Sequence, residues 1–244
     1  MFGFLPVCLV SWSILGMSFQ DLELEVPIFF QGRGTKRFLK SDLNGIRWSP
    51  VFRLYKTTFD MCCALAAMPV ILLLAVLLLI VNPVLNPGPL MFVQKRMGRN
   101  RQAFYMYKFR TMLPSGDTAR GPEAGLETDR ITALGGFLRR TRVDELPNFI
   151  NVLLGEMSVI GPRPDAIEHA EYFSQLIGHY NERFRVKPGI TGLAQIEHGY
   201  ADGAEATALK AMYDQRYVEA SCGRLDVYIA LRTIFVMASG FGAK

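Results

Sequence analysis

One uncharged apolar run occupies residues 61–81 of the chain. At about 1.5 Å per residue, a helix of this length reaches roughly 32 Å, which is enough to span a bilayer. Pro69 lies inside the run and removes one helix hydrogen bond. Basic residues flank both ends of the run: Arg47, Arg53 and Lys56 before it, and Lys95, Arg96, Arg99 and Arg101 after it. Because Lys and Arg favour the cytoplasmic side, a helix that breaks at Pro69 and returns to that side would satisfy the charge pattern, whereas a straight span would not. Kinked spans are common, so these residues alone favour a proline-kinked spanning helix, and the re-entrant helix stays open as the alternative.

A second pattern predicts a short amphipathic helix in residues 144–154. Its apolar positions follow the i, i+3, i+4, i+7, i+8 spacing of one helix face: Leu146, Phe149, Ile150, Leu153 and Leu154. Asn148 and Asn151 lie off this stripe. Pro147 is tolerated only in a first turn and Gly155 is a natural terminator, so the helix is expected to begin near Asp144 and end near Leu154.

The rest of the chain divides more coarsely. Residues 1–19 are uncharged and mostly apolar but lack the features of a signal peptide, and residues 20–52 read as a linker. Residues 113–128 are rich in Pro, Gly and charge and are predicted to form a mobile loop. Residues 165–180 predict a helix with one buried face. Residues 225–237 are apolar apart from Asp226 and Arg232, and predict a helix in the membrane interface or against the core.

Composition narrows the functional classes. Half of the 244 residues are hydrophobic and the net charge is +5, which indicates an anionic membrane surface or an anionic substrate. The basic clusters lack the aromatic interleaving or zinc spacing of a nucleic-acid module, so we expect no nucleic-acid partner. The four cysteines have no CxxC spacing, which favours reduced thiols. No P-loop, GxGxxG or HExxH motif is present.

Candidate chemistry gathers in residues 137–164. Arg139, Arg140 and Arg142 directly precede the adjacent carboxylates Asp144 and Glu145. A helix N-terminus there would keep a carboxylate ionised and attract phosphate. Because adjacent helical residues point in different directions, we expect divided roles, with one carboxylate on a reacting phosphorus and the other on a metal.

Arg163 stands between Pro162 and Pro164, and the two prolines stiffen a turn that would present a guanidinium fork to phosphate. The simpler interpretation of both features is an ordinary helix start and a surface turn.

Five blocks of sequence together carry a resemblance. They are QKRMG at 94–98, KFRTM at 108–112, DRIT at 129–132, DELPNFINVLLGEMSVIGPRP at 144–164 and KPGITGLAQ at 187–195. In this order they resemble the bacterial sugar transferases, the monotopic phosphoglycosyl transferases that begin exopolysaccharide, O-antigen or glycoprotein glycan assembly on a polyprenyl carrier.

The resemblance implies a mostly helical α/β fold. It also implies a monotopic membrane protein with a re-entrant helix-break-helix, a small cytosolic catalytic domain and amphipathic interfacial helices. The expected divisions are an extension and linker at 1–52, a re-entrant membrane helix at 53–85 broken at Pro69, and the catalytic domain at 86–244. The expected location is the cytoplasmic face of a bacterial inner membrane, in contact with its lipids. A homodimer is an open alternative.

The resemblance further implies transfer of a sugar 1-phosphate from a UDP-sugar to undecaprenyl phosphate, with release of UMP. Asp144 would attack the β-phosphorus and form a covalent aspartyl phosphosugar intermediate. Glu145 would bind Mg²⁺. Arg139 and Arg163 would hold phosphate oxygens, and Lys108 and Arg110 are weaker candidates for the same task.

Two other functions stay open at this point. One is a single-displacement transferase in which Asp144 only positions metal. The other is a catalytically inactive membrane adaptor of a polysaccharide export system. The intact pair Asp144-Glu145 and Arg163 argue against the adaptor. The identity of the sugar does not follow from these residues.

Overall fold

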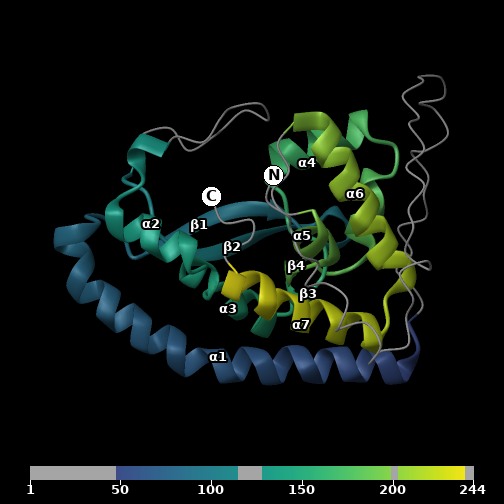
Figure 1. Cartoon of the computed structure of the whole chain (residues 1–244), viewed down its shortest axis with the longest axis horizontal. Helices are drawn as coiled ribbons and strands as arrows, with labels where there is room; N and C mark the ends of the chain where they lie inside the picture. The colour runs from purple at the N-terminus through teal and green to yellow at the C-terminus, as the bar shows by residue number, and fades with distance from the viewer. Residues whose placement is uncertain (1–47, 115–127, 199–202, 240–244) are drawn as a thin grey trace, which may run out of the picture. The chain divides into compact units, whose positions relative to one another are not determined.

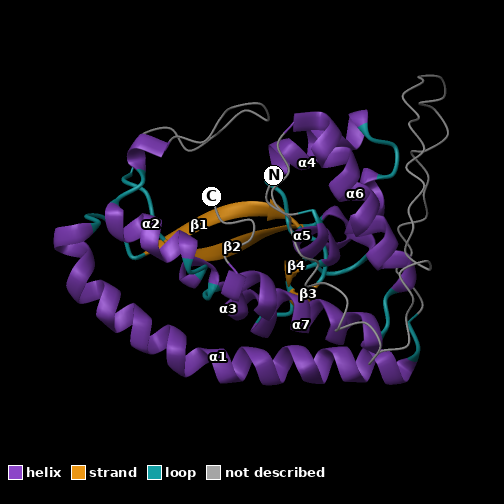
Figure 2. Ribbon diagram, in the orientation of Figure 1, coloured by secondary structure: helices purple, strands orange, loops and turns teal. Residues whose placement is uncertain are grey.

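The computed structural model describes residues 48–114, 128–198 and 203–239. The predictions for residues 1–47 and for most of the loop at 113–128 lie outside these ranges. The described residues form a mostly helical α/β unit with two small sheets, which confirms the predicted fold class at this level (Figure 1, Figure 2).

The helices are α1 (Pro50–Leu85), α2 (Ala133–Arg140), α3 (Asn148–Leu153), α4 (Ile167–Leu176), α5 (Leu193–Glu197), α6 (Gly203–Ala220) and α7 (Gly223–Ser239). The strands are β1 (Met91–Met97), β2 (Ala103–Phe109), β3 (Ser158–Ile160) and β4 (Gly189–Thr191), and the 3₁₀ helices are η4 (Arg99–Arg101), η5 (Thr128–Arg130), η6 (Val143–Glu145) and η7 (Tyr180–Arg185).

The apolar run lies in α1, a single helix of 36 residues that is continuous through Pro69. The predicted break at Pro69 is therefore wrong: the chain keeps its helical conformation on both sides of the proline. Figure 1 shows instead that the axis of α1 changes direction along its length. A proline removes one N–H and crowds the preceding turn, which bends a helix without having to end it.

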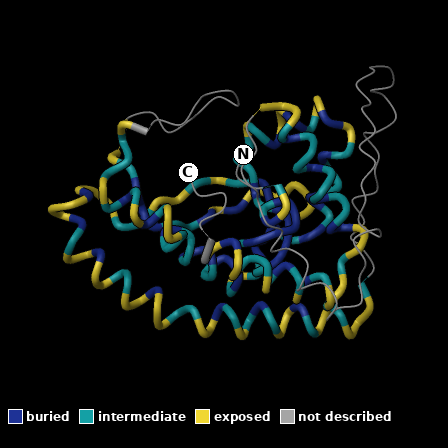
Figure 3. The backbone as a smooth tube through the Cα atoms, viewed as in Figure 1, coloured by how far each residue is buried: buried dark blue, intermediate teal, exposed yellow. Residues whose placement is uncertain are grey.

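The helix α1 turns most of its apolar side chains outward. Only 17% of its most apolar window is buried, and its exposed side chains include Leu72, Leu73, Val76, Leu77 and Ile80. Exposed positions recur along the whole helix in Figure 3. Among the described residues, α1 is the one helix long and apolar enough to cross a membrane. An apolar face this large indicates contact with a membrane.

Two charged residues fix the inner face of α1 to the rest of the unit. Lys56 Nζ donates to Ile160 O at 2.9 Å and pairs with Asp226 Oδ2 at 2.9 Å. Asp60 Oδ1 accepts from Ser158 Oγ at 3.0 Å and from Val159 N at 2.9 Å. Lys56 was counted among the basic residues that flank the apolar run, but it is 5% exposed and faces the protein.

The two sheets have different geometries. β1 and β2 form an antiparallel hairpin whose register runs from Met91 opposite Phe109 to Met97 opposite Ala103. β3 and β4 form a short parallel pair, with Ser158 opposite Gly189. α3 packs between β2 and α1 and contacts both elements. The hairpin therefore supports one side of α3, and α1 supports the other.

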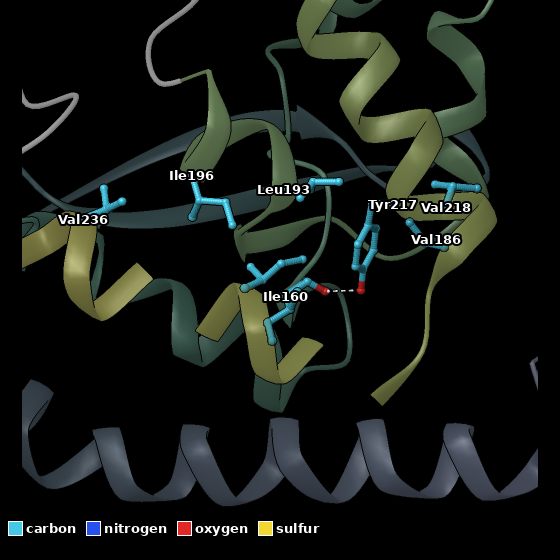
Figure 4. Close-up of a cluster of buried hydrophobic side chains, with 8 residues drawn as sticks. Ile160, Val186, Leu193, Ile196, Tyr217, Val218 and Val236 are labelled. Atoms are coloured by element: carbon cyan, nitrogen blue, oxygen red, sulfur yellow. Dashed lines mark hydrogen bonds between the residues drawn. The ribbon is translucent and has the colours of Figure 1, made fainter. Parts of the chain in front are cut away.

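The largest hydrophobic cluster surrounds β3 and joins α5, α6 and α7 (Figure 4). Ile160 and Ile229 are fully buried in it, and Tyr217 OH donates to Ile160 O at 3.2 Å. The outer face of α7 stays exposed at Leu231 and Phe235. The predicted helix at 225–237 is therefore confirmed, and one of its faces packs on the core. Its contact with a membrane interface stays a prediction.

Candidate active site

The carboxylate pair lies in η6 and not, as predicted, at the start of an α-helix. Pro147 has no N–H to donate to the Val143 carbonyl, and that carbonyl instead accepts from Leu146 N at 3.2 Å, a bond of 3₁₀ type. The α-helix begins only at Asn148. Its predicted end is confirmed, because Gly155 follows Leu154 with a φ of +79°.

Arg142 sets the direction in which η6 leaves α2. Its φ of 56° and ψ of 16° lie in the left-handed region, which residues other than glycine rarely adopt. The turn is held by Arg142 N donating to Arg139 O and by Glu145 N donating to Arg142 O, each at 3.1 Å. This reversal brings the carboxylate pair next to β2.

Glu145 is bound by two cations from distant parts of the chain. Arg163 grips it as a fork, with Nη1 at 3.0 Å from Oε2 and Nη2 on Oε1, and Lys108 Nζ lies 2.7 Å from Oε1. Burial alone would raise the pKa of Glu145, but Arg163 and Lys108 hold that pKa well below its ordinary value. We call these three residues the Glu145 cluster. Glu145 is therefore ionised at neutral pH.

Asp144 has the opposite environment. Its residue is 8% exposed, and its carboxylate accepts no hydrogen bond within the described part of the chain. Burial and the neighbouring charge of Glu145 raise the pKa of Asp144 to about 6, although Lys108 and Arg139 oppose the shift. The two adjacent carboxylates thus differ in bonding and in proton affinity, as divided roles require.

Arg163 is held in place through its backbone. Arg183 Nη2 donates to Arg163 O at 2.7 Å. The turn before it packs directly on β4, where a Cβ added to Gly189 would lie 2.1 Å from Gly161 N. Only glycine permits this approach, which explains why the GPRP and KPGITG blocks occur together.

Beneath Arg163 lies a second group of charges that the sequence did not reveal. Asp165 accepts from Tyr180 OH at 2.5 Å and from Lys210 Nζ at 2.9 Å, and it pairs with Arg183. Arg183 also forms an ion pair with Asp214 at 2.9 Å. We call these five residues the Asp165 cluster. The sequence offered only a weak signal for this cluster, because each of its charged residues stands alone in an otherwise ordinary segment.

The remaining predicted site residues fall in two places. Arg139 Nε donates to Thr111 Oγ1 at 2.8 Å, and its charge acts on Asp144. Arg110 is engaged elsewhere, because its guanidinium donates to Pro89 O at 2.6 Å, to Met112 O at 2.8 Å and to Asn86. The described contacts of Arg110 thus lie at the C-terminal end of α1 and in the segments beside it, and its role in binding phosphate stays a prediction.

The carboxylates partly fit the Mg²⁺ that the resemblance implies. Among the described residues, no group of three or more His, Cys, Asp or Glu side chains is placed to hold a metal ion. Mg²⁺ is commonly held by one or two carboxylates together with substrate phosphates. Asp144 and Glu145 suit such a shared ion, because within the described ranges Asp144 accepts no hydrogen bond and Glu145 Oε2 accepts one. Phosphate would have to accompany the ion, since Lys108 and Arg163 already balance Glu145.

Comparison with known proteins gives consistent matches. A model of the family described as bacterial sugar transferase matches residues 51–240. The chain is 37% identical over 206 residues to the UDP-N-acetylgalactosamine-undecaprenyl-phosphate N-acetylgalactosaminephosphotransferase of Aeromonas hydrophila, covering 84% of this chain and 48% of that protein. It is 38% identical over 214 residues to the UDP-glucose:undecaprenyl-phosphate glucose-1-phosphate transferase of Escherichia coli K12, covering 82% of this chain and 46% of that protein.

A shorter relative matches along most of its own length. The exopolysaccharide production protein PSS of Rhizobium leguminosarum bv. phaseoli is 38% identical over 189 residues, covering 74% of this chain and 91% of that protein. The chain thus spans less than half of the two longer relatives, at 48% and 46%, and nearly all of the shorter one.

Proposed function

The chain belongs to the bacterial sugar transferase family, and on this basis we propose that it transfers a sugar 1-phosphate from a UDP-sugar to undecaprenyl phosphate. The two longer relatives are named for this reaction, one with N-acetylgalactosamine and the other with glucose. UMP is the leaving group, and the product is a polyprenyl diphosphate sugar that starts a surface polysaccharide.

The observation that carries the proposal is the contrast between the two adjacent carboxylates. Glu145 is ionised and bound by Arg163 and Lys108, whereas Asp144 accepts no hydrogen bond in the described residues and is the carboxylate left for covalent chemistry. An oxygen of Asp144 attacks the β-phosphorus, and the bond from that phosphorus to the bridging oxygen breaks. UMP leaves with the bridging oxygen. An oxygen of undecaprenyl phosphate then attacks the same phosphorus and releases the Asp144 carboxylate.

The cations around the pair bind the phosphates. Arg163 offers a planar guanidinium and Lys108 an ammonium group. Each can exchange the Glu145 carboxylate for phosphate oxygens, so that it keeps an anionic hydrogen-bond acceptor. Arg139 lies on the Asp144 side of the site. A bound Mg²⁺ would offset the charge of the diphosphate, and Glu145 is the residue we assign to hold it.

The apolar outer faces of α1 and α7 support placement at a membrane. We propose the cytoplasmic face of the bacterial inner membrane, where UDP-sugars and the carrier phosphate meet. Because α1 is bent and basic residues lie beyond both ends of its apolar run, we further propose that α1 re-enters and leaves on the same side. Arg53 precedes the apolar run, and Lys95 and Arg96 follow it.

Incubation of the purified protein with a UDP-sugar alone tests the proposal. A covalent intermediate predicts a rapid release of about one UMP per active site, followed by steady turnover only when undecaprenyl phosphate is added. Turnover with acceptor but without the initial burst would favour the single-displacement transferase. Absence of UMP under both conditions, over a panel of UDP-sugars, would favour the adaptor.

A further inference from the structure

Asn148 is the first residue of α3 and lies three residues after Glu145 in the chain. Glu145, Asn148 and Asn151 follow one another at intervals of three residues, a spacing that places side chains along one side of a helix. Glu145 at one end of this row bonds Lys108 of β2. Asn151 at the other end bonds the backbone of β2, with Nδ2 donating to Tyr105 O at 2.7 Å. Asn148 therefore faces β2 one turn behind Glu145.

The two asparagines are equally buried but differ in bonding. Both are 0% exposed. Asn151 uses both ends of its carboxamide, because Oδ1 also accepts from Tyr107 N at 3.2 Å. In Asn148 neither Oδ1 nor Nδ2 has a hydrogen-bond partner among the described residues. Buried amides in native proteins are almost always bonded, so an amide without a partner calls for a reason other than packing.

Asp144 offers the complementary acceptor. It precedes Asn148 by four residues, and its carboxylate is buried and accepts no hydrogen bond in the described residues. Two buried polar groups four residues apart, one able to donate and the other able to accept, are thus both without a hydrogen-bond partner among the described residues.

We infer that Asn148 is a positioning residue for Asp144. When Asp144 turns toward the phosphorus, Asn148 Nδ2 donates to the carboxylate oxygen that does not attack. The bond fixes the orientation of the attacking oxygen and persists to the carbonyl oxygen of the acylphosphate. This inference rests on the proposed function, because it assigns Asn148 a task in the reaction of Asp144.

Two substitutions of Asn148 separate this role from a structural one. Asn148→Leu replaces an unbonded buried amide by an apolar group of similar size, so the melting temperature should stay level or rise. Its kcat should fall about 10- to 100-fold, the range expected for one lost preorganised donor, while KM for the UDP-sugar stays within about threefold. Asn148→Gln keeps the amide but adds a methylene to a filled space, so it should melt lower and yet be more active than Asn148→Leu.

The matched control is Asn151→Leu. It removes two hydrogen bonds to β2, so its melting temperature should fall while kcat per folded molecule stays close to that of the wild type. The measurements are kcat, KM and the melting temperature of all four proteins in the same detergent. Wild-type kcat in Asn148→Leu, or kcat values that follow melting temperature across the series, would overturn the inference. If the wild-type protein itself releases no UMP, the proposed function fails and the inference falls with it.

Discussion

The Glu145 cluster and the Asp165 cluster are joined through Arg163 and have different roles. Arg163 belongs to the first through its guanidinium, and its carbonyl is bound by Arg183 of the second. The two arginines differ most: the side chain of Arg163 is 28% exposed and that of Arg183 is 2% exposed. The other charged side chains overlap, since Lys108 is 18% exposed and Lys210 and Asp165 are each 16% exposed. A guanidinium that reaches solvent can exchange a carboxylate for a phosphate, whereas a sealed guanidinium can only hold position. Exposure therefore separates the two arginines, and not the two clusters as wholes.

The largest expected effect is that of Asp144→Asn on turnover. An amide of nearly the same shape cannot attack phosphorus, so we expect kcat to fall by about four decades or more. The fold should survive, because the Asp144 carboxylate makes no hydrogen bond in the described residues. Steady-state UMP release and circular dichroism measure the two properties. Residual activity within tenfold of the wild type would remove Asp144 from the covalent role.

Arg183→Met should mainly lower stability and should affect turnover only through the loss of folded protein. It leaves Asp165 and Asp214 without their shared cation, and breaking such buried pairs costs about 3–5 kcal/mol of stability. Activity should be lost in proportion to the unfolded fraction, as measured by chemical denaturation and by turnover at several temperatures. A stable but inactive Arg183→Met variant would mean that the Asp165 cluster takes a direct part in the chemistry.

The raised pKa of Asp144 predicts a stability difference that depends on pH. Its folded-state pKa of about 6 lies above the ordinary 3.8, so the stability gained by its neutral form is present below about pH 4 and lost as pH rises through 6. At 1.36 kcal/mol per pKa unit, Asp144→Asn should be more stable than the wild type by about 3 kcal/mol above pH 7 and nearly equal to it near pH 4. Metal-free denaturation curves at several pH values test this. Curves that keep a constant separation would contradict it.

Glu145→Gln tests which residue serves the metal. A neutral amide oxygen is a poorer ligand for Mg²⁺ than a carboxylate, so the Mg²⁺ concentration for half-maximal activity should rise roughly tenfold or more. Unlike Asp144→Asn, this variant should keep measurable turnover at high Mg²⁺. An unchanged Mg²⁺ titration would leave Glu145 as a partner of Arg163 and Lys108 only.

The smallest expected effect belongs to Arg163→Lys. Lysine keeps the charge but loses the fork that binds both oxygens of Glu145, so we expect kcat/KM to fall about tenfold. Lys108→Arg is the matched exchange in the opposite direction within the same cluster. Equal activity of Arg163→Lys and wild type would mean that the site requires only a positive charge at this place.

Local patterns predicted the parts of the site that depend on neighbouring residues. The end of the helix at Gly155 and the contact between Glu145 and Arg163 agree with the predictions from residues 137–164. The predicted apolar stripe is confirmed in part: Leu146, Phe149 and Leu153 pack against hydrophobic clusters, but Leu154 is 61% exposed. The spacing did not predict that Asn148 and Asn151 are buried. α3 packs on β2 as well as on α1, so the face that carries no apolar stripe is covered too.

Long-range pairing explains contacts that the sequence patterns did not predict. Lys56 reads as a flanking cation, but its partner Asp226 lies 170 residues later in the chain. Arg110 stands in the KFRTM block beside Lys108, yet it donates to Asn86, the C-cap of α1, and to Pro89. At Pro69 the local preference for a break yields to the packing of α1 on the unit along both of its halves.

The pairing of Lys56 with Asp226 also has a consequence for biosynthesis. During translation α1 emerges well before its partners, and the 170 residues up to Asp226 take roughly 9 to 34 s at typical rates of synthesis. For that interval Lys56 lacks its carboxylate partner, whereas the partners of Asp60, Ser158 and Val159, follow after 98 and 99 residues. Lys56 and Asp60 are four residues apart and offset each other only in part. Charged groups on one side of α1 oppose its complete insertion into lipid. We therefore expect nascent α1 to stay at the membrane surface until α7 has been synthesised.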